Sequence, residues 1–111
     1  MRATRKPTSV GEILFYEYLE PLNLKISDLA KILNIHRNTA GALVNGKARL
    51  SLEMALRLSK AFNTSPDFWI SIQTKSDLWE LENDVKFQES LTQIIPPNIY
   101  QAQSPSYTQQ V

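Results

Sequence analysis

Residues 24–46 hold the feature that most restricts the fold of this chain: two short helical patterns separated by a corner of about three residues. Asn34, which closes the first pattern, belongs to a residue type that tolerates the left-handed conformation in which many helices end. Ala30 is small enough for two helices to cross closely, and Ile35 fixes the corner by burying its apolar side chain. The apolar residues expected to build the shared core are Leu29, Leu33, Ala40 and Leu43. We therefore expect two short helices packed against each other.

The whole chain predicts an all-α fold with five helices, because apolar residues recur at helical spacing and strand-like alternation is not sustained. Ser9 and Glu12 have the spacing of a capping box at the start of the first helix. Pro21 prevents this helix from continuing past the preceding residue. The N-caps expected for the second, fourth and fifth helices are Ser27, Ser51 and Ser65.

The third and fifth helices have recognisable limits. The third is expected from about His36 to Asn45, with Gly46 as the residue that ends it. The fifth has Pro66 at its first position and is expected to run to about Val85, a length of roughly 30 Å. It would be the longest helix of the chain.

These helices predict a single domain at residues 9–85. A flexible basic arm is expected before it, at residues 1–8. From about residue 90 the composition changes to Pro, Gln, Ser and Tyr, which bury too little apolar area to offset the entropy lost on ordering. Residues 90–111 are therefore expected to form a disordered tail.

The net charge of +1 hides an uneven distribution along the chain. Residues 1–10 carry +3 and residues 29–63 carry +5, whereas residues 11–28 carry −3 and residues 64–95 carry −4. A basic middle between acidic flanks is typical of a protein that presents one face to a polyanion. A solvated helical surface would show a similar distribution, so charge alone does not decide between them.

The outward residues of the third helix are polar or small and include no carboxylate, which suits insertion into the major groove of DNA. The residues expected to read bases are Arg37, Asn38, Thr39, Gly41 and Ala42. Arg37 can donate two hydrogen bonds to guanine, or can clamp a phosphate instead. Asn38 can read adenine or cap the helix. Thr39 can contact a thymine methyl group or a phosphate, or simply form helix surface.

A second set of residues is expected to hold the phosphate backbone, with a solvated loop as the alternative. They flank the third helix or begin the second, where backbone N–H groups favour an anion: Ser27, His36, Asn45, Lys47 and Arg49. Arg2, Arg5 and Lys6 on the N-terminal arm could reach DNA, contact an acidic partner, or remain idle.

The fifth helix carries more large apolar residues than so small a domain can cover. A second copy of the chain is expected to cover part of them, at Phe68, Trp69, Ile72, Leu78 and Trp79. The alternative places both tryptophans in the core of one chain. The polar stretch at residues 73–77 could instead break this helix in two.

Several classes of protein are disfavoured by what the sequence lacks. Without cysteine the chain forms no disulfide and no thiolate metal site, which fits a reducing cytoplasm. A single histidine and the lack of a cofactor fingerprint argue against an enzyme, so we expect no catalytic residue, cofactor or metal. No run approaches the roughly 18–20 apolar residues that a membrane span requires.

Three stretches resemble a known family: KPTSVGEIL with YLEPL, LAKILNIHRNTAGALVNGKARLS, and AFNTSPDFWISIQTKSDLWELEN. Over about residues 7–85 the chain resembles the lambda-repressor-like (XRE) helix-turn-helix class and, within it, the VapI/HigA antitoxin family. The resemblance implies five helices, a dimer built through the long last helix, and repression at a palindromic operator, hence association with the nucleoid. It also implies, as an alternative main role, that the chain neutralises a HigB-type toxin, a messenger-RNA endonuclease.

Overall fold

The computed structural model describes residues 5–103, and the regular secondary structure in this range is entirely helical. The elements are α1 (Val10–Ile13), the π-helix η1 (Leu14–Leu19), α2 (Ile26–Leu33), α3 (Arg37–Val44), α4 (Leu52–Phe62), α5 (Pro66–Glu82), α6 (Val85–Leu91) and α7 (Pro97–Gln103). The predicted all-α fold is confirmed. Among the described residues, α6 and α7 follow the five expected helices.

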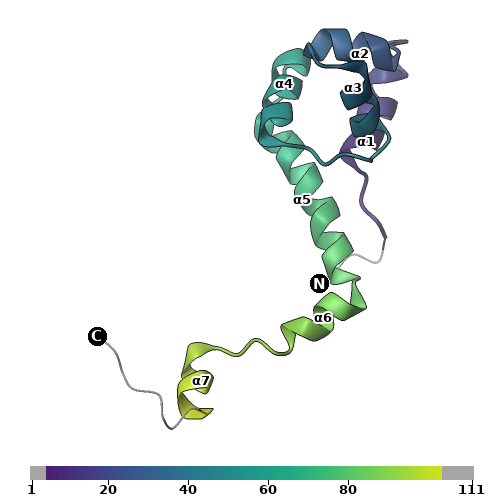
Figure 1. Cartoon of the computed structure of the whole chain (residues 1–111). Helices are drawn as coiled ribbons and strands as arrows, with labels where there is room; N and C mark the ends of the chain where they lie inside the picture. Colours follow the sequence, from purple (N-terminus) through teal and green to yellow (C-terminus); the bar gives the residue numbers. More distant parts are fainter. Residues whose placement is uncertain (1–4, 104–111) are drawn as a thin grey trace. The chain divides into compact units, whose positions relative to one another are not determined.

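The chain divides into two units between Trp79 and Glu80. In the first unit, α4 and α5 form one side of a small bundle, and α1 and α3 form the other (Figure 1). Contacts of α2 with both α3 and α4, and of α1 with α3, hold this bundle together. None of the helices within residues 5–103 combines the length and the apolar character needed to cross a membrane.

The first helix begins as predicted but changes its winding. The Glu12 N–H donates to Ser9 Oγ (3.2 Å) and the Ser9 N–H donates to Glu12 Oε1 (2.9 Å), which confirms the capping box. From Leu14 to Leu19 the helix is a π-helix, and both of these leucines are buried, at 0% and 2% exposure. Five residues of regular α-helix would place them about 140° apart around the axis. The wider turn therefore brings a second leucine into the core.

Helix α2 ends as predicted but begins at a different residue. Asn34 adopts the left-handed conformation (φ 55°, ψ 51°), as expected. The prediction of Ser27 as the N-cap of α2 is wrong, because the cap is Lys25 and the helix begins at Ile26. The carboxylate of Asp28, the third residue of the helix, accepts a hydrogen bond from the N–H of the N-cap residue Lys25 (2.8 Å).

The hydrophobic core joins all the helices of the first unit. Its buried members are Val10, Leu14, Leu19, Leu29, Ala30, Leu33, Ala40, Leu43, Leu50, Ala55, Leu58 and Trp69. The Trp69 ring packs near the rings of Tyr18 and Phe62, with centroids 5.9 and 6.4 Å away. Its indole N–H donates to Thr64 Oγ1 (2.6 Å), so the polar edge of this buried ring is satisfied.

Helix α5 is continuous through residues 73–77, so the polar stretch does not break it. The helix ends at Glu82 and not near Val85, because Asp84 starts a new helix by accepting a hydrogen bond from the Phe87 N–H (3.1 Å). In the second unit, α6 and α7 contain no buried residue. Residues 97–103 are helical where the sequence predicts a disordered tail, and residues 104–111 lie outside the described range.

Candidate nucleic-acid interface

The start of α3 is capped by a histidine side chain. His36 Nδ1 accepts a hydrogen bond from the Asn38 N–H (3.1 Å), so His36 and not the Asn38 side chain provides the cap. A neutral imidazole that accepts at Nδ1 carries its proton on Nε2. The exposed ring of His36 therefore has a donor available for an anion beside the entrance of α3.

The outer face of α3 has the composition expected of a base-reading helix. Arg37, Asn38 and Thr39 are exposed, and Gly41 and Ala42 are half-buried. The inner face is anchored by Ala40 and Leu43, at 0% and 3% exposure. Residues 36–46 contain no Asp or Glu, so this face would not repel a phosphate backbone.

Two glycines near α3 differ in what their lack of a side chain permits. A Cβ at Gly41 would meet only Ile26 Cγ2, at 3.9 Å, which is an ordinary contact. A Cβ at Gly11 would collide with the carbonyl oxygen of Val44 and lie 2.8 Å from that of Leu43. Gly11 thus lets α1 pack directly on the backbone at the end of α3, a role that the sequence gave no reason to assign. Packing does not require glycine at 41.

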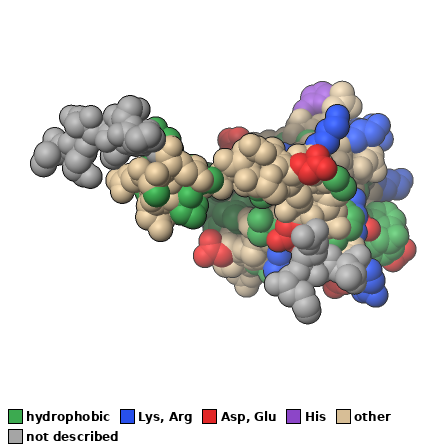
Figure 2. Space-filling model, turned by 90° about the horizontal axis from the view of Figure 1, so that it is seen from below, with side chains coloured by type: hydrophobic (Ala, Val, Ile, Leu, Met, Phe, Trp, Pro, Cys, Tyr) green, Lys and Arg blue, Asp and Glu red, His purple; other side chains and the backbone are tan. Residues whose placement is uncertain are grey.

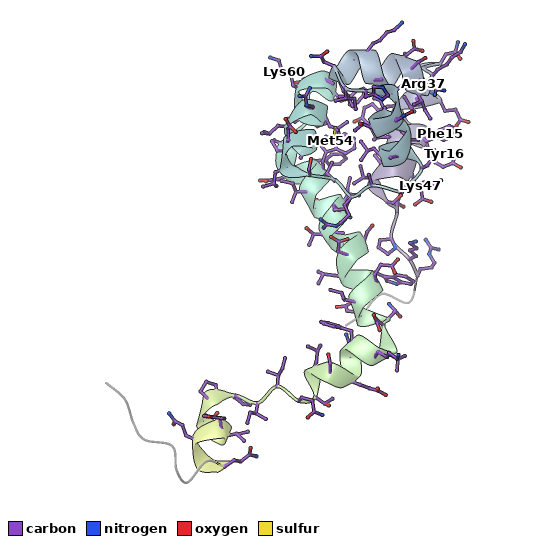
Figure 3. The ribbon with its side chains drawn as sticks, viewed as in Figure 1. Phe15, Tyr16, Arg37, Lys47, Met54 and Lys60 are labelled. Atoms are coloured by element: carbon purple, nitrogen blue, oxygen red, sulfur yellow. The ribbon has the colours of Figure 1, made fainter. Side chains whose placement is uncertain are left out.

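The residues expected to hold phosphates lie at several places around α3. Arg37 and Lys47 are near opposite ends of this helix (Figure 3). Lys47 and the C-cap residue Asn45 are exposed and flank Gly46, whose φ of +75° ends the helix as predicted. Ser27, in the first turn of α2, is half-buried.

Arg49 differs from the other expected phosphate-binding residues because it forms an ion pair with Asp77 on α5. The same carboxylate accepts a hydrogen bond from Gln73 Nε2 (2.9 Å), while Gln73 Oε1 accepts one from the Leu50 N–H (2.9 Å). The Arg49 hydrogen bond lowers the pKa of Asp77 below its ordinary value. These contacts tie the loop after α3 to the middle of α5.

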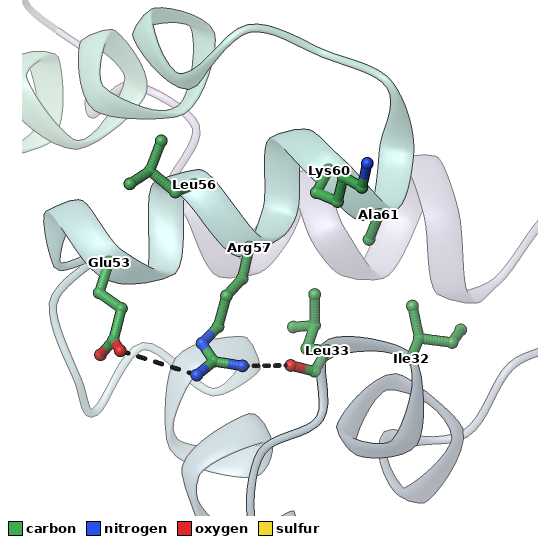
Figure 4. Close-up of a pocket in the computed structure, with 7 residues that line it drawn as sticks. All are labelled: Ile32, Leu33, Glu53, Leu56, Arg57, Lys60 and Ala61. Carbon is green, nitrogen blue, oxygen red and sulfur yellow. Dashed lines mark hydrogen bonds and ion pairs between the residues drawn. The ribbon is translucent and has the colours of Figure 1, made fainter.

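Arg57 is a second cation of the basic segment that serves the fold. Its guanidinium donates to the carbonyl oxygens of Leu33 (2.8 Å) and Asn34 (3.3 Å), at the end of α2, and also lies 3.6 Å from Glu53 (Figure 4). Because the last carbonyls of a helix lack partners within it, this arginine stabilises the corner before α3. The sequence alone predicts no role for Arg57 beyond its positive charge.

The positive charge is distributed over the surface and is not confined to α3. Lysine and arginine side chains lie on the bundle with acidic ones between them (Figure 2). Within residues 29–63, the exposed Lys31 and Arg37 lie near the corner, and the exposed Lys47 follows the other end of α3. On the N-terminal arm, Arg5 and Lys6 are exposed, and Arg2 lies outside the described residues.

The expected interface on α5 needs one correction. Trp69 is fully buried at 0% exposure, so it belongs to the core of the single chain and is not available to a second copy. Phe68 packs edge to face against it and is 41% exposed. Ile72 and Trp79 are half-buried and Leu78 is exposed.

A model of the helix-turn-helix family matches residues 15–69, from η1 to the first turn of α5. The chain is 55% identical to the HTH-type transcriptional regulator YbaQ of Escherichia coli K12, over 84% of this chain and 82% of the relative. It is 40% identical to antitoxin HigA-1 of Vibrio cholerae, over 86% and 90%. A solved structure of Pseudomonas aeruginosa antitoxin HigA with the higBA promoter aligns with a TM-score of 0.71 and 28% identity, covering 82% of this chain and 97% of that one.

Proposed function

Because the chain belongs to the XRE-type helix-turn-helix family, in the branch that includes the HigA antitoxins, we propose that it is a DNA-binding transcriptional repressor. In this proposal a dimer reads a palindromic operator, with one α3 in the major groove of each half-site. The protein would act in the cytoplasm and associate with the nucleoid when bound to DNA.

The observation that carries the proposal is the outer face of α3. Arg37, Asn38 and Thr39 are exposed on a short helix whose entrance is fixed by the left-handed Asn34 and the His36 cap. We assign base contacts to these three residues and to Gly41 and Ala42. Phosphate contacts are assigned to Ser27, His36, Asn45, Lys47 and Arg49, the last after exchange of Asp77 for a phosphate.

The dimer is supported by apolar side chains left exposed on α5. Phe68 is 41% and Leu78 is 52% exposed, and a contact with a second copy would cover both. Ile72 and Trp79 would border this contact. In such a dimer the two α3 helices would lie about one helical turn of DNA, roughly 34 Å, apart.

The direct test is to select binding sites from a random DNA library and then compare variants of Arg37 on the selected site. Selection should yield two inverted half-sites. Arg37→Ala should lower affinity for the site by about 1–3 kcal/mol and relax the preference at a single guanine. Arg37→Lys is the matched control, because lysine retains the charge but lacks the paired donors that recognise guanine.

The two variants separate base reading from phosphate binding. If Arg37→Lys binds as well as the unaltered protein, Arg37 contacts a phosphate and the assignment to base reading is wrong. If both variants weaken binding to all sequences equally, the same conclusion follows. A selection that returns no preferred sequence would contradict the function itself.

A second candidate function is favoured by the 40% identity to HigA-1. In it, the main role of the protein is to bind and silence a HigB-type toxin, with repression of its own operon as a secondary role. The test is to look beside the gene for a short open reading frame and to ask whether the product of that frame arrests growth. Co-expression of this chain with that product should restore growth. Failure to restore growth would contradict the antitoxin role but not the proposal of DNA binding.

A further inference from the structure

The outer face of η1 carries two aromatic side chains that the bundle leaves exposed. Phe15 is 40% and Tyr16 is 60% exposed, and their rings pack edge to face with centroids 4.9 Å apart. Both project from the side of the bundle formed by α1 and α3 (Figure 3). Scattered exposed apolar residues are ordinary, but large neighbouring rings are typical of the centres of protein interfaces.

The winding of η1 produces this exposure. The Glu20 N–H bonds to the Phe15 carbonyl five residues earlier (2.9 Å), and the wide turn directs Leu14 and Leu19 into the core. The residues between the two leucines then lie on the outside, apart from the half-buried Tyr18. Because π-helical turns are rare and occur frequently at functional sites, an exposed aromatic pair in one indicates a binding role.

The charged residues of η1 and its flanking turns have one sign. Glu17 and Glu20 are exposed beside them, and residues 12–23 contain three glutamates and no lysine or arginine. Such a face repels phosphate groups, so neither DNA nor an anionic membrane suits it. Guanidinium groups, in contrast, are attracted both to aromatic faces and to carboxylates.

We propose that Phe15, Tyr16, Glu17 and Glu20 form a docking surface for a cationic protein. Arginine and lysine side chains of the partner would cover the two rings and pair with the two carboxylates. The inference does not depend on DNA binding. It would supply the second candidate function with a contact surface if the partner is a toxin.

The test begins with a photo-cross-linking amino acid placed at Tyr16 in cells that naturally make the protein. The same amino acid at Leu56 on α4 is the matched control, because that side chain is 59% exposed and lies beside the basic residues Arg57 and Lys60. The cross-linked protein is identified by mass spectrometry, purified, and titrated against the full-length chain. We expect capture of one protein of positive net charge at Tyr16 and not at Leu56.

The affinity of variants for the captured protein then tests whether the rings and the carboxylates make the contact. The Phe15→Ala/Tyr16→Ala variant should bind it at least about tenfold more weakly, as expected when interface anchors are removed. The Glu17→Gln/Glu20→Gln variant keeps the rings and changes little volume. It should bind more weakly at low salt and approach the unaltered protein as salt rises. Leu56→Ala should bind normally, and all three variants should retain affinity for the selected DNA site.

Several results would overturn the proposal. They are the absence of a cross-link at Tyr16, capture of a second copy of this chain, capture of a neutral or acidic protein, and equal capture at both positions. Unchanged affinity in both double variants would also overturn it. Loss of DNA affinity in the glutamine variant would place η1 in the DNA interface instead.

Discussion

The outer faces of α3 and η1 belong to the same bundle but differ in charge and in the type of side chain that they expose. The α3 face has polar and basic side chains with no carboxylate between residues 36 and 46, whereas the η1 face has two exposed rings and no cation between residues 12 and 23. We propose a polyanion as the partner of the first face and a cationic protein as the partner of the second. In the two proposals, the bundle separates its partners by the sign of the charge on each face.

Both faces depend on the same hydrophobic core, so the largest effect is expected from removal of a buried core side chain. Trp69→Ala should lower the free energy of unfolding by about 3–5 kcal/mol, because a large buried side chain that packs near Tyr18 of η1 is lost. Denaturant titration at two protein concentrations gives the measurement. A loss confined to low concentration would instead place Trp69 in the dimer interface. Phe68→Ala, the neighbouring exposed ring, should cost less.

Gly11→Ala should disturb the α3 face more than the η1 face. The added methyl group would collide with the Val44 carbonyl, and such overpacking costs about 1–3 kcal/mol. Amide chemical shifts should move most at Leu43 and Val44, and affinity for the selected DNA site should fall at a temperature where the variant is folded. Unchanged affinity in a folded variant would show that Gly11 does not position α3.

Gly41→Ala should separate the stability of α3 from its function. Alanine favours a helix over glycine by about 1 kcal/mol, and the structure offers space for the methyl group. Thermal unfolding should therefore occur at a higher temperature, while DNA affinity falls because the methyl group prevents close approach to the groove. Equal DNA affinity would exclude Gly41 from the contact surface.

Asp77→Asn should have the smallest effect, because exposed ion pairs contribute about 0–1 kcal/mol. The pKa of Asp77 is lowered in the folded chain, so its contribution is present above the ordinary carboxyl pKa and disappears as pH falls through the lowered value. The free energies of unfolding of the unaltered protein and of Asp77→Asn should therefore become equal in acid. The variant also frees Arg49, and DNA affinity should rise slightly more than in Asp67→Asn, which removes the same charge from α5. An equal rise would show that freeing Arg49 does not strengthen DNA binding.

Local signals in the sequence predicted much of the first unit correctly. Ser9, Asn34, Ser51 and Ser65 mark helix ends through interactions with residues no more than five positions away, and each of these ends is confirmed. The error at Ser27 also has a local origin, because Asp28 bonds back to the Lys25 N–H and the helix begins at Ile26, two residues before the start that a Ser27 cap predicts.

Long-range contacts explain most of what the sequence did not reveal. Arg49 meets a carboxylate 28 positions later, and Arg57 meets a carbonyl 24 positions earlier, so neither partner is visible as a spacing. Gly11 lies against backbone that only the folded chain brings there. The π-helix is the exception, since the five-residue spacing of Leu14 and Leu19 was a signal present in the sequence.

The most direct test of the account is an amide chemical-shift titration of the full chain with the selected DNA site. The account predicts the largest changes at residues 36–47, with those of Phe15 to Glu20 small and independent of DNA sequence. Large changes confined to η1, with α3 unaffected, would contradict it.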